Sequence, residues 1–341
     1  MRLGLALGYS GEPMSEVLPA VQAADRVGYD SVWSLEEFGP DGVTILGYLA
    51  AKTERIKLGT GVLQVAPRTP ALTSMTATTL DALSGQRTLL GLGLSQPWLI
   101  EGWHGLPFHH PTDVLREYVT VLRKAIAREG PLEFEGRYYQ IPYRGPHARG
   151  VSRPLKALYP PPRTEIPIYL GTTGPRNVAL TGEIADGWLV GGLYIPEHEK
   201  VCLAPLEEGI ARAGRRRSDV TIAKVIDVIR DDDLDAARAE VRAVLASYLG
   251  PRGVGVRNVH FEQACEMGWE AAAHRVRALF TEGRRKEAAA EVPDELVDQY
   301  ALLGPLDRII DRLVAWKESR VDVLVLLTRD VELIEAAQAA L

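Results

Sequence analysis

Cysteine is scarce in this sequence. The 341 residues include two cysteines, Cys202 and Cys265, and they show no C-x-x-C spacing. Neither a disulfide framework nor a zinc site built on cysteine is expected. His104, His109 and His110 form neither an H-E-x-x-H motif nor an i, i+4 pair, so we expect no metal centre. This cysteine usage is typical of a protein from the reducing cytoplasm.

The sequence also has fewer basic than acidic residues, and it has no long apolar run. The chain has 39 Lys and Arg against 45 Asp and Glu, a formal net charge of −6. A nucleic-acid partner is not expected, because its recognition needs an excess of basic residues to displace counterions from phosphates. No stretch approaches the roughly 20 apolar residues of a membrane span, and the first apolar run is too short for a signal peptide. We therefore expect no membrane partner and no export.

Short β-type runs alternate with helical stretches. Strands are expected at 2–7, 31–34, 57–62, 88–94, 166–171, 187–192, 220–229 and 321–327. Helices are expected at 14–27, 42–53, 70–83, 112–128, 175–185, 197–213, 232–248 and 305–319. This alternation predicts an α/β fold with a parallel sheet, and its eight βα units predict a (β/α)8 TIM barrel.

The expected barrel is a single domain over residues 1–341, with insertions near 130–165 and 250–300. At 46% apolar and 25% charged residues, the chain can bury a substantial core. A doubly wound sheet is the rival architecture. It favours fewer strands and an early G-x-G-x-x-G turn, and the first βα turn, "LGYSGEPMS", lacks that spacing.

TIM barrels bind ligands at the carboxyl ends of their strands, and two such ends carry polar groups. Glu36 and Glu37 follow the second strand, where they could share a proton or polarise a substrate, or simply be solvated loop carboxylates. Ser95 and Gln96 follow the fourth strand, close to Trp103. Polar groups interleaved with aromatics are typical of a small-molecule pocket.

The end of the fifth strand predicts an anion site. The turn "GTTGPRN", residues 171–177, leads into a helix that begins near Pro175. The free N–H groups and the dipole of this helix favour a phosphate. An ordinary helix start with proline at its first position would show the same sequence pattern. The segment 137–163 carries six basic residues and no acid, which indicates a nearby anionic part of a ligand or a solvated loop.

The third strand, "KLGTGVLQV", is interrupted by Gly59 and Gly61. Glycine inside a strand forgoes packing and usually marks a bulge or a close approach to the backbone. The glycines therefore predict that something lies flat against this strand.

At these residues the chain resembles the bacterial luciferase-like superfamily, and within it the coenzyme F420-dependent oxidoreductases. The resemblance is carried by "SVWSLEEFGPD", "LGTGVLQVAPRTP", "LGLGLSQPWLIEGWHGLPF", "RPLKALYPPPRTEIPIYLGTTGPRNVALTGEIADGW" and "VPDELVDQYALLGPLDRIIDRL". It spans nearly the whole chain and includes both insertions. It implies a TIM barrel with a deazaflavin at the carboxyl ends of the strands, hydride transfer at the deazaflavin C5, and frequent homodimers.

The resemblance also implies roles for particular residues. A bulge with a non-prolyl cis peptide at Gly61–Val62 would support the back of the deazaflavin ring, together with Leu63. Ser95 and Gln96 would lie by the ring edge or the substrate. The cofactor phosphate would lie on the turn that contains Gly171, Thr172, Thr173, Gly174, Arg176 and Asn177.

One departure from the family pattern concerns the acid or base. Some F420 dehydrogenases have an Asp-His pair after strand 2, whereas this chain has Glu36 and Glu37. A sugar-phosphate dehydrogenase is therefore not implied, and the identity of the proton-exchanging group stays open.

The leading interpretation is an F420-dependent oxidoreductase that moves a hydride between F420 and a small organic substrate, with Glu36, Glu37 and Gln96 as candidate catalytic groups. One alternative is an FMN-dependent monooxygenase with a reductase partner. Another is an F420-binding protein without turnover. The basic insertion favours F420, because its acidic oligoglutamate tail is absent from FMN.

Overall fold

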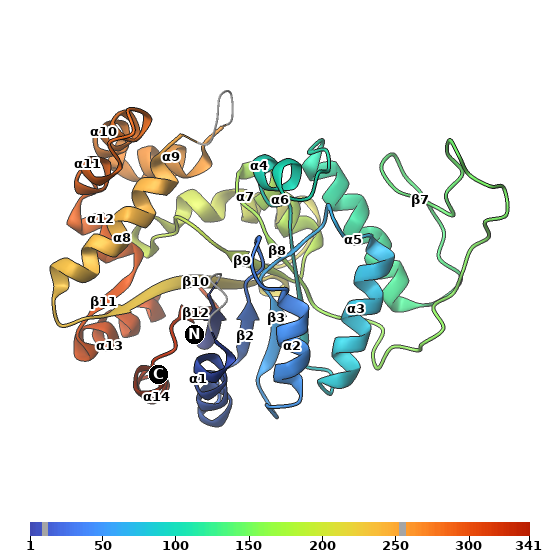
Figure 1. Cartoon of the computed structure of the whole chain (residues 1–341), viewed down its shortest axis with the longest axis horizontal. Coiled ribbons are helices and arrows are strands. Elements are labelled where there is room, and N and C mark those ends of the chain that lie inside the picture. The colour runs from blue at the N-terminus through green and yellow to red at the C-terminus, as the bar shows by residue number, and fades with distance from the viewer. Residues whose placement is uncertain (9–12, 252–256) are drawn as a thin grey trace.

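The computed structural model describes residues 1–8, 13–251 and 257–341, and within them eight parallel strands close into a barrel (Figure 1). In barrel order these strands are β1 (Arg2–Leu7), β2 (Ser31–Ser34), β3 (Lys57–Thr60), β5 (Thr88–Gly93), β8 (Ile168–Gly171), β9 (Gly187–Val190), β10 (Thr221–Arg230) and β12 (Val323–Leu327). Parallel pairing of β12 with β1 closes the ring. The predicted eight-stranded barrel is confirmed.

Helices surround the barrel. They are α1 (Met14–Val27), α2 (Gly42–Ala50), α3 (Pro70–Leu83), α5 (Pro111–Ala127), α6 (Pro175–Ile184), α7 (Glu199–Arg212), α8 (Leu234–Leu249), α13 (Leu306–Ala315) and α14 (Val331–Ala339). Local chemistry fixes several starts: the side chains of Asp41 and Thr69 accept hydrogen bonds from N–H groups of the first turns of α2 and α3. Two helices end three or more residues earlier than the sequence predicts, α2 at Ala50 and α13 at Ala315. The short α4 (Pro97–Gly102) was not predicted.

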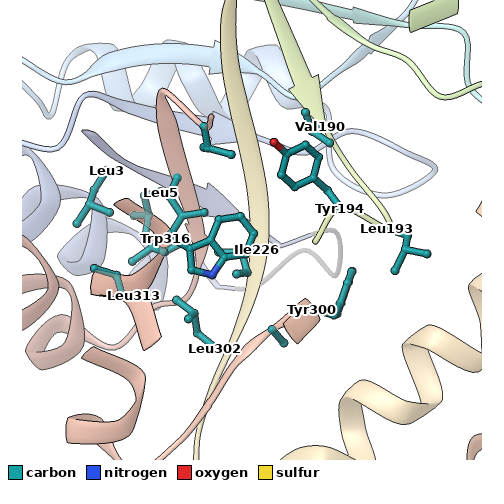
Figure 2. Packing of buried hydrophobic residues seen from close by; sticks show 14 of the residues in the cluster. Leu3, Leu5, Val190, Leu193, Tyr194, Ile226, Tyr300, Leu302, Leu313 and Trp316 are labelled. Carbon is teal, nitrogen blue, oxygen red and sulfur yellow. The ribbon is translucent and has the colours of Figure 1, made fainter. Parts of the chain in front are cut away.

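The hydrophobic core has two layers, as expected for a parallel sheet covered on its outer face. Inside the barrel lie Trp33, Tyr169 and smaller apolar side chains from the other strands. Between strands and helices, a larger cluster includes Tyr194 and Trp316, whose rings stack with centroids 6.4 Å apart. Figure 2 shows Leu302, Leu313 and Trp316 grouped around Ile226 of β10.

Trp33 explains one of the two glycines in the third strand. A Cβ atom at Gly59 would lie 2.3 Å from Cε3 of the Trp33 ring. That ring is buried and meets Tyr169 edge-on, with the centroids 5.1 Å apart. What lies flat against Gly59 is therefore a side chain of this chain, and no ligand is needed to account for it.

The insertion near 130–165 packs beside α3 and α5 and contains the hairpin of β6 (Phe134–Glu135) and β7 (Gln140–Ile141) (Figure 1). The carboxylate of Glu117 on α5 accepts hydrogen bonds from the backbone N–H groups of residues 137–139. Arg163 pairs with Asp81 of α3, which is fully buried, through two hydrogen bonds of 3.0 and 2.7 Å. The insertion is thus fastened to the outside of the barrel.

The second insertion, near 250–300, lies at the other end of the molecule in Figure 1. Residues 252–256 are outside the described part of the chain. The remainder forms α9 (Val259–Ala264), a π-helical turn (Cys265–Trp269), α10 (Glu270–Thr281), α11 (Arg285–Ala290) and α12 (Asp294–Tyr300). It leads into β11 (Leu302–Gly304), which pairs with the end of β10. Among the described residues, no helix is both long and apolar enough to cross a membrane.

The Arg163–Asp81 pair yields a stability prediction. Arg163→Ala leaves the buried Asp81 carboxylate without its guanidinium partner, so we expect the free energy of unfolding to fall by about 3 kcal/mol. Arg144→Ala is the matched control, because Arg144 is exposed on the same insertion. Urea unfolding measures both variants. Equal stability of the two would contradict a structural role for this ion pair.

Candidate active site

A cavity of about 200 Å³ opens at the carboxyl ends of the barrel strands. Its lining comes from the segments that follow β2, β3, β8 and β9, from β10 and β12, and from α8 and α12. The lining residues are Leu35, Gly61, Val62, Gly171, Thr172, Thr173, Leu189, Gly191, Gly192, Val225, Asp227, Tyr248, Tyr300 and Leu327. Segments distant in sequence thus converge on one apolar, glycine-rich cavity with a few polar groups, a composition typical of ligand sites.

The floor of the cavity is the break between β3 and β4 (Leu63–Gln64). The peptide bond Gly61–Val62 is cis, as the resemblance predicted. Three residues separate Gly59 from Leu63, whereas two separate their partners on β5, Leu89 and Leu92. One extra residue on one strand is a β-bulge, so the predicted bulge is confirmed.

The Val62 side chain occupies space that neighbouring glycines leave open. A Cβ atom at Gly93 would lie 2.3 Å from Cγ2 of Val62, and one at Gly171 would lie 2.7 Å from its Cγ1. A Cβ atom at Gly91 would lie 1.8 Å from the Thr60 carbonyl oxygen. These glycines are required because the bulge brings Val62 and the backbone before it against β5 and β8.

In the predicted phosphate turn after β8, some residues bond to other parts of the protein and others are exposed. Thr172 is buried and serves the fold, because its hydroxyl pairs with Thr181 at 2.7 Å and its carbonyl accepts the Trp188 indole N–H. The amide oxygen of Asn177 accepts a hydrogen bond from Thr112 of α5 at 2.7 Å.

Thr173 and Arg176, in contrast, are exposed. Among the residues that the structure describes, no polar partner of the Arg176 guanidinium is found. Gly174 caps α6 with φ +81°, a left-handed conformation that favours glycine. Thr173, Arg176 and the first N–H groups of α6 are therefore the groups that can receive an anion here.

Glu36 and Glu37 border a neighbouring pocket of about 260 Å³. The Glu36 carboxylate pairs with Arg68 at 2.9 Å and accepts the Gly42 backbone N–H at 3.2 Å. The Glu37 backbone carbonyl accepts a hydrogen bond from the Gln64 side chain at 2.5 Å. Glu36 thus holds its own loop to the start of α2 and to Arg68.

Gln64, the lone amide that follows the bulge, links two loops of the barrel mouth. Its amide nitrogen donates to the Glu37 carbonyl, and its amide oxygen lies 3.0 Å from Nε2 of His104. Sequence reasoning assigned this amide no role. The structure shows that Gln64 fastens the loop after β2 to the segment after α4.

Besides Glu36 and Glu37, six predicted site residues lie outside the lining of the 200 Å³ cavity. Leu63 is fully buried in the cluster between the sheet and α3 and α5, because the bulge turns its side chain to the outer face. Ser95 has φ +61° and is half-buried, and Gln96 follows it as the cap of α4. Gly174, Arg176 and Asn177 follow the lining residues along the same turn but are not themselves part of that lining.

Sequence reasoning missed Gly191, Gly192, Asp227, Tyr248 and Tyr300. The two glycines are the last residues of the strand predicted over 187–192 and directly follow β9, so the rule that drew attention to the other strand ends could have found them. Asp227 is a lone acid in an apolar strand run. The tyrosines carry no such signal, because they reach the cavity from the ends of α8 and α12.

Two groups near this wall have displaced pKa values. Burial lowers the pKa of Lys224 to about 8, although Asp227 and Cys202 act in the opposite direction. Burial raises the pKa of Tyr300 well above its ordinary value, and interactions with Tyr248 and Asp227, including hydrogen bonds, add to the rise.

The fold and the cavity define a parallel (β/α)8 barrel with an open cavity at the carboxyl ends of its strands. A sequence model of the luciferase-like monooxygenase family matches residues 1–323, and the chain belongs to this family.

Two relatives align with this chain over most of their length. A Mycobacterium tuberculosis protein named "Putative coenzyme F420-dependent oxidoreductase" is 40% identical over 335 residues, which cover 97% of this chain and 96% of that protein. The 5,10-methylenetetrahydromethanopterin reductase of Archaeoglobus fulgidus is 28% identical over 294 residues, 86% of this chain and 83% of that protein.

Solved structures match the whole fold. The coenzyme F420-dependent tetrahydromethanopterin reductase of Methanopyrus kandleri superposes with a TM-score of 0.77 at 22% identity, covering 100% of this chain and 99% of that one. An F420-dependent secondary alcohol dehydrogenase in complex with an F420-acetone adduct gives 0.75 at 19% identity, covering 100% and 98%. At these identities the likeness concerns the fold.

Proposed function

We propose that this chain is a coenzyme F420-dependent oxidoreductase that transfers a hydride between F420 and a small organic substrate. The observation that carries the proposal is the meeting of the Gly61–Val62 bulge and the Gly171–Thr173 turn in one cavity. The names of the relatives, at 40% and 28% identity over most of the chain, point to the same chemistry.

The residues present fit a deazaflavin with a phosphate. The glycine-flanked Val62 offers a side-chain-poor floor for a flat ring, and Gly191 and Gly192 open the adjacent wall. Thr173 and Arg176 are exposed on the turn where the phosphate would lie. Bound there, F420 would supply the carbon that accepts or donates the hydride. This chain's part is to position the ring, hold the phosphate and exclude water.

The FMN-dependent alternative shares the phosphate turn, so this turn alone does not separate the two cofactors. The basic insertion is weaker support for F420 than the sequence indicated. Arg163 is engaged by Asp81, the Arg137 guanidinium lies over the Tyr138 ring, and no cavity-lining residue comes from the insertion. If the oligoglutamate tail is bound by this segment, Arg144, Arg149, Arg153 and Lys156 are the basic residues left to receive it.

A homodimer is the second part of the proposal. The insertion, α3 and α5 border an apolar groove of about 660 Å³. Its exposed apolar residues include Met75 at 62%, Leu155 at 68% and Leu158 at 98% relative exposure. Contiguous apolar surface of this kind is unusual on a monomer, and we assign a second copy of this chain as its cover.

The cofactor assignment is tested by titrating F420 and FMN separately into the protein and following fluorescence. We expect F420 to bind more tightly than FMN, and more weakly as salt rises if basic residues hold its tail. Arg176→Ala should weaken F420 binding by about tenfold or more, because a charge-assisted hydrogen bond to the phosphate is lost. Lys317→Ala is the control for general charge, because Lys317 is exposed on the segment before β12, at the end of the barrel away from the cavity. Tighter binding of FMN would overturn the assignment and favour the monooxygenase.

Glu36, Glu37 and Gln96 stay the proposed substrate-facing groups. Glu36→Gln and Glu37→Gln should each lower the turnover rate with little change in F420 affinity. Since Glu36 pairs with Arg68, Arg68→Gln should reproduce the Glu36→Gln effect, whereas Glu37→Gln should act independently of it. Turnover is followed as the change in F420 absorbance. Full activity in both glutamate variants would mean that these carboxylates only maintain the loop.

The oligomeric state is tested with a charge in the groove. Leu158→Asp places a carboxylate where the proposed partner packs, so we expect a dimer to become a monomer in sedimentation velocity experiments. Val151→Asp is the matched control, since Val151 is exposed on the same insertion but does not line the groove. A monomeric wild-type protein would refute the dimer.

A further inference from the structure

Lys224 places an ammonium group in the interior, directly behind the cavity wall. Its side chain has no solvent exposure, and its Nζ donates a hydrogen bond of 2.9 Å to the carbonyl of Gly192. Lysine is rarely buried, because removing its charge from water is costly unless the ammonium is well paired. A buried lysine that bonds to a cavity-lining turn therefore calls for an explanation beyond packing.

Two other neighbours of this ammonium, Tyr300 and Asp227, border the cavity. The Tyr300 ring centroid lies 5.3 Å from Nζ, within the range of a cation–π contact. The Tyr300 hydroxyl forms hydrogen bonds with Asp227 and Tyr248, and all three of these residues line the cavity. Asp227 is on the same strand as Lys224 and attracts its charge. Lys224 thus stands between the glycine turn and the Asp227 side of the cavity.

The turn itself is held in a narrow range of conformations. Gly192 has φ +70°, and a Cβ atom there would lie 2.3 Å from Cε1 of the His260 ring. The next carbonyl, that of Leu193, accepts a weak hydrogen bond from the Cys202 thiol of α7 at 3.5 Å. Among the described groups that contact the turn, Lys224 is the one that brings a full charge to a peptide carbonyl.

We propose that Lys224 is a positioning residue that fixes the Gly191–Gly192 turn in the conformation required to bind the cofactor. Its ammonium attracts both the Gly192 carbonyl and the Asp227 carboxylate, and so holds the turn in place relative to Asp227. The inference rests on the proposed function, since the turn is assigned to F420. Without the ammonium, the Gly192 carbonyl loses its buried donor, and the glycines are free to rotate out of the wall.

Binding of F420 itself, measured by fluorescence titration, tests the proposal without any substrate. Lys224→Met keeps the length of the side chain and removes the ammonium, and should weaken F420 binding by about tenfold or more. Lys224→Gln keeps a donor without the charge and should recover part of that loss. Lys57→Met is the matched control, because Lys57 pairs with Asp30 at the start of β3, far along the barrel from the cavity.

Two glycine variants test the turn separately from the lysine. Gly192→Ala drives a methyl into His260 and should weaken F420 binding as Lys224→Met does. Gly214→Ala, at a similar φ of +65° but in open space, should leave binding unchanged. If both act through one turn, the double variant K224M/G192A should weaken binding by less than the product of the single effects.

The outcomes separate the two proposals. Wild-type protein that fails to bind F420 overturns the proposed function and with it this inference. Wild-type protein that binds F420, with an unchanged affinity in folded Lys224→Met, overturns the inference alone. If Lys224→Met does not fold, as judged by circular dichroism, the Lys224→Gln variant is used in its place. Wild-type F420 affinity in both Lys224→Gln and Gly192→Ala, measured separately, refutes the positioning role.

Discussion

The close packing of the Val62 side chain against β5 and β8 is the constraint on which the cavity depends. Gly93 and Gly171 are register partners on these two strands, and both would collide with Val62 if they carried a Cβ atom. A bulge of one residue brings Val62 to this place. That one contact determines the floor of the cavity and requires glycine on two neighbouring strands. It also determines the direction of the chain after the bulge.

The same bulge organises the rim. By inserting one residue it turns Leu63 to the outer cluster, since a shift of one residue exchanges the two faces of a strand. Gln64 then lies between the Glu37 carbonyl and His104 and joins the loops after β2 and α4. The position of the candidate carboxylates is thus tied, through one amide, to the strand that forms the cavity floor.

Much of this architecture could be predicted from the sequence, because strand ends in a parallel barrel are local signals that converge in space. The eight strands and the turn at 171–174 follow from periodicity and glycine placement, and the cis bond at Gly61–Val62 followed from family resemblance. What sequence could not supply are contacts between distant segments. Gly59 faces Trp33, and Glu36 pairs with Arg68, and neither partner has a spacing that marks it.

The part of the cavity wall formed by β10, α8 and α12 shows most clearly that contacts between distant segments cannot be predicted from the sequence. Tyr248 comes from the helix before the second insertion and Tyr300 from the last helix within it, and Lys224 approaches from the outer face of β10. From the sequence alone, a lysine in an apolar strand run is expected to be a solvated edge residue. The fold shows instead that Gly192, Tyr300 and Asp227 surround it. The half of the cavity built on β3 and β8 is apolar and rich in glycine, whereas the half built on β10 carries an acid, two phenols and a buried ammonium behind it. Under the proposed function, the first half accommodates the flat ring, so discrimination among substrates falls to the second half, whose chemistry depends on a segment that the strand pattern does not reveal.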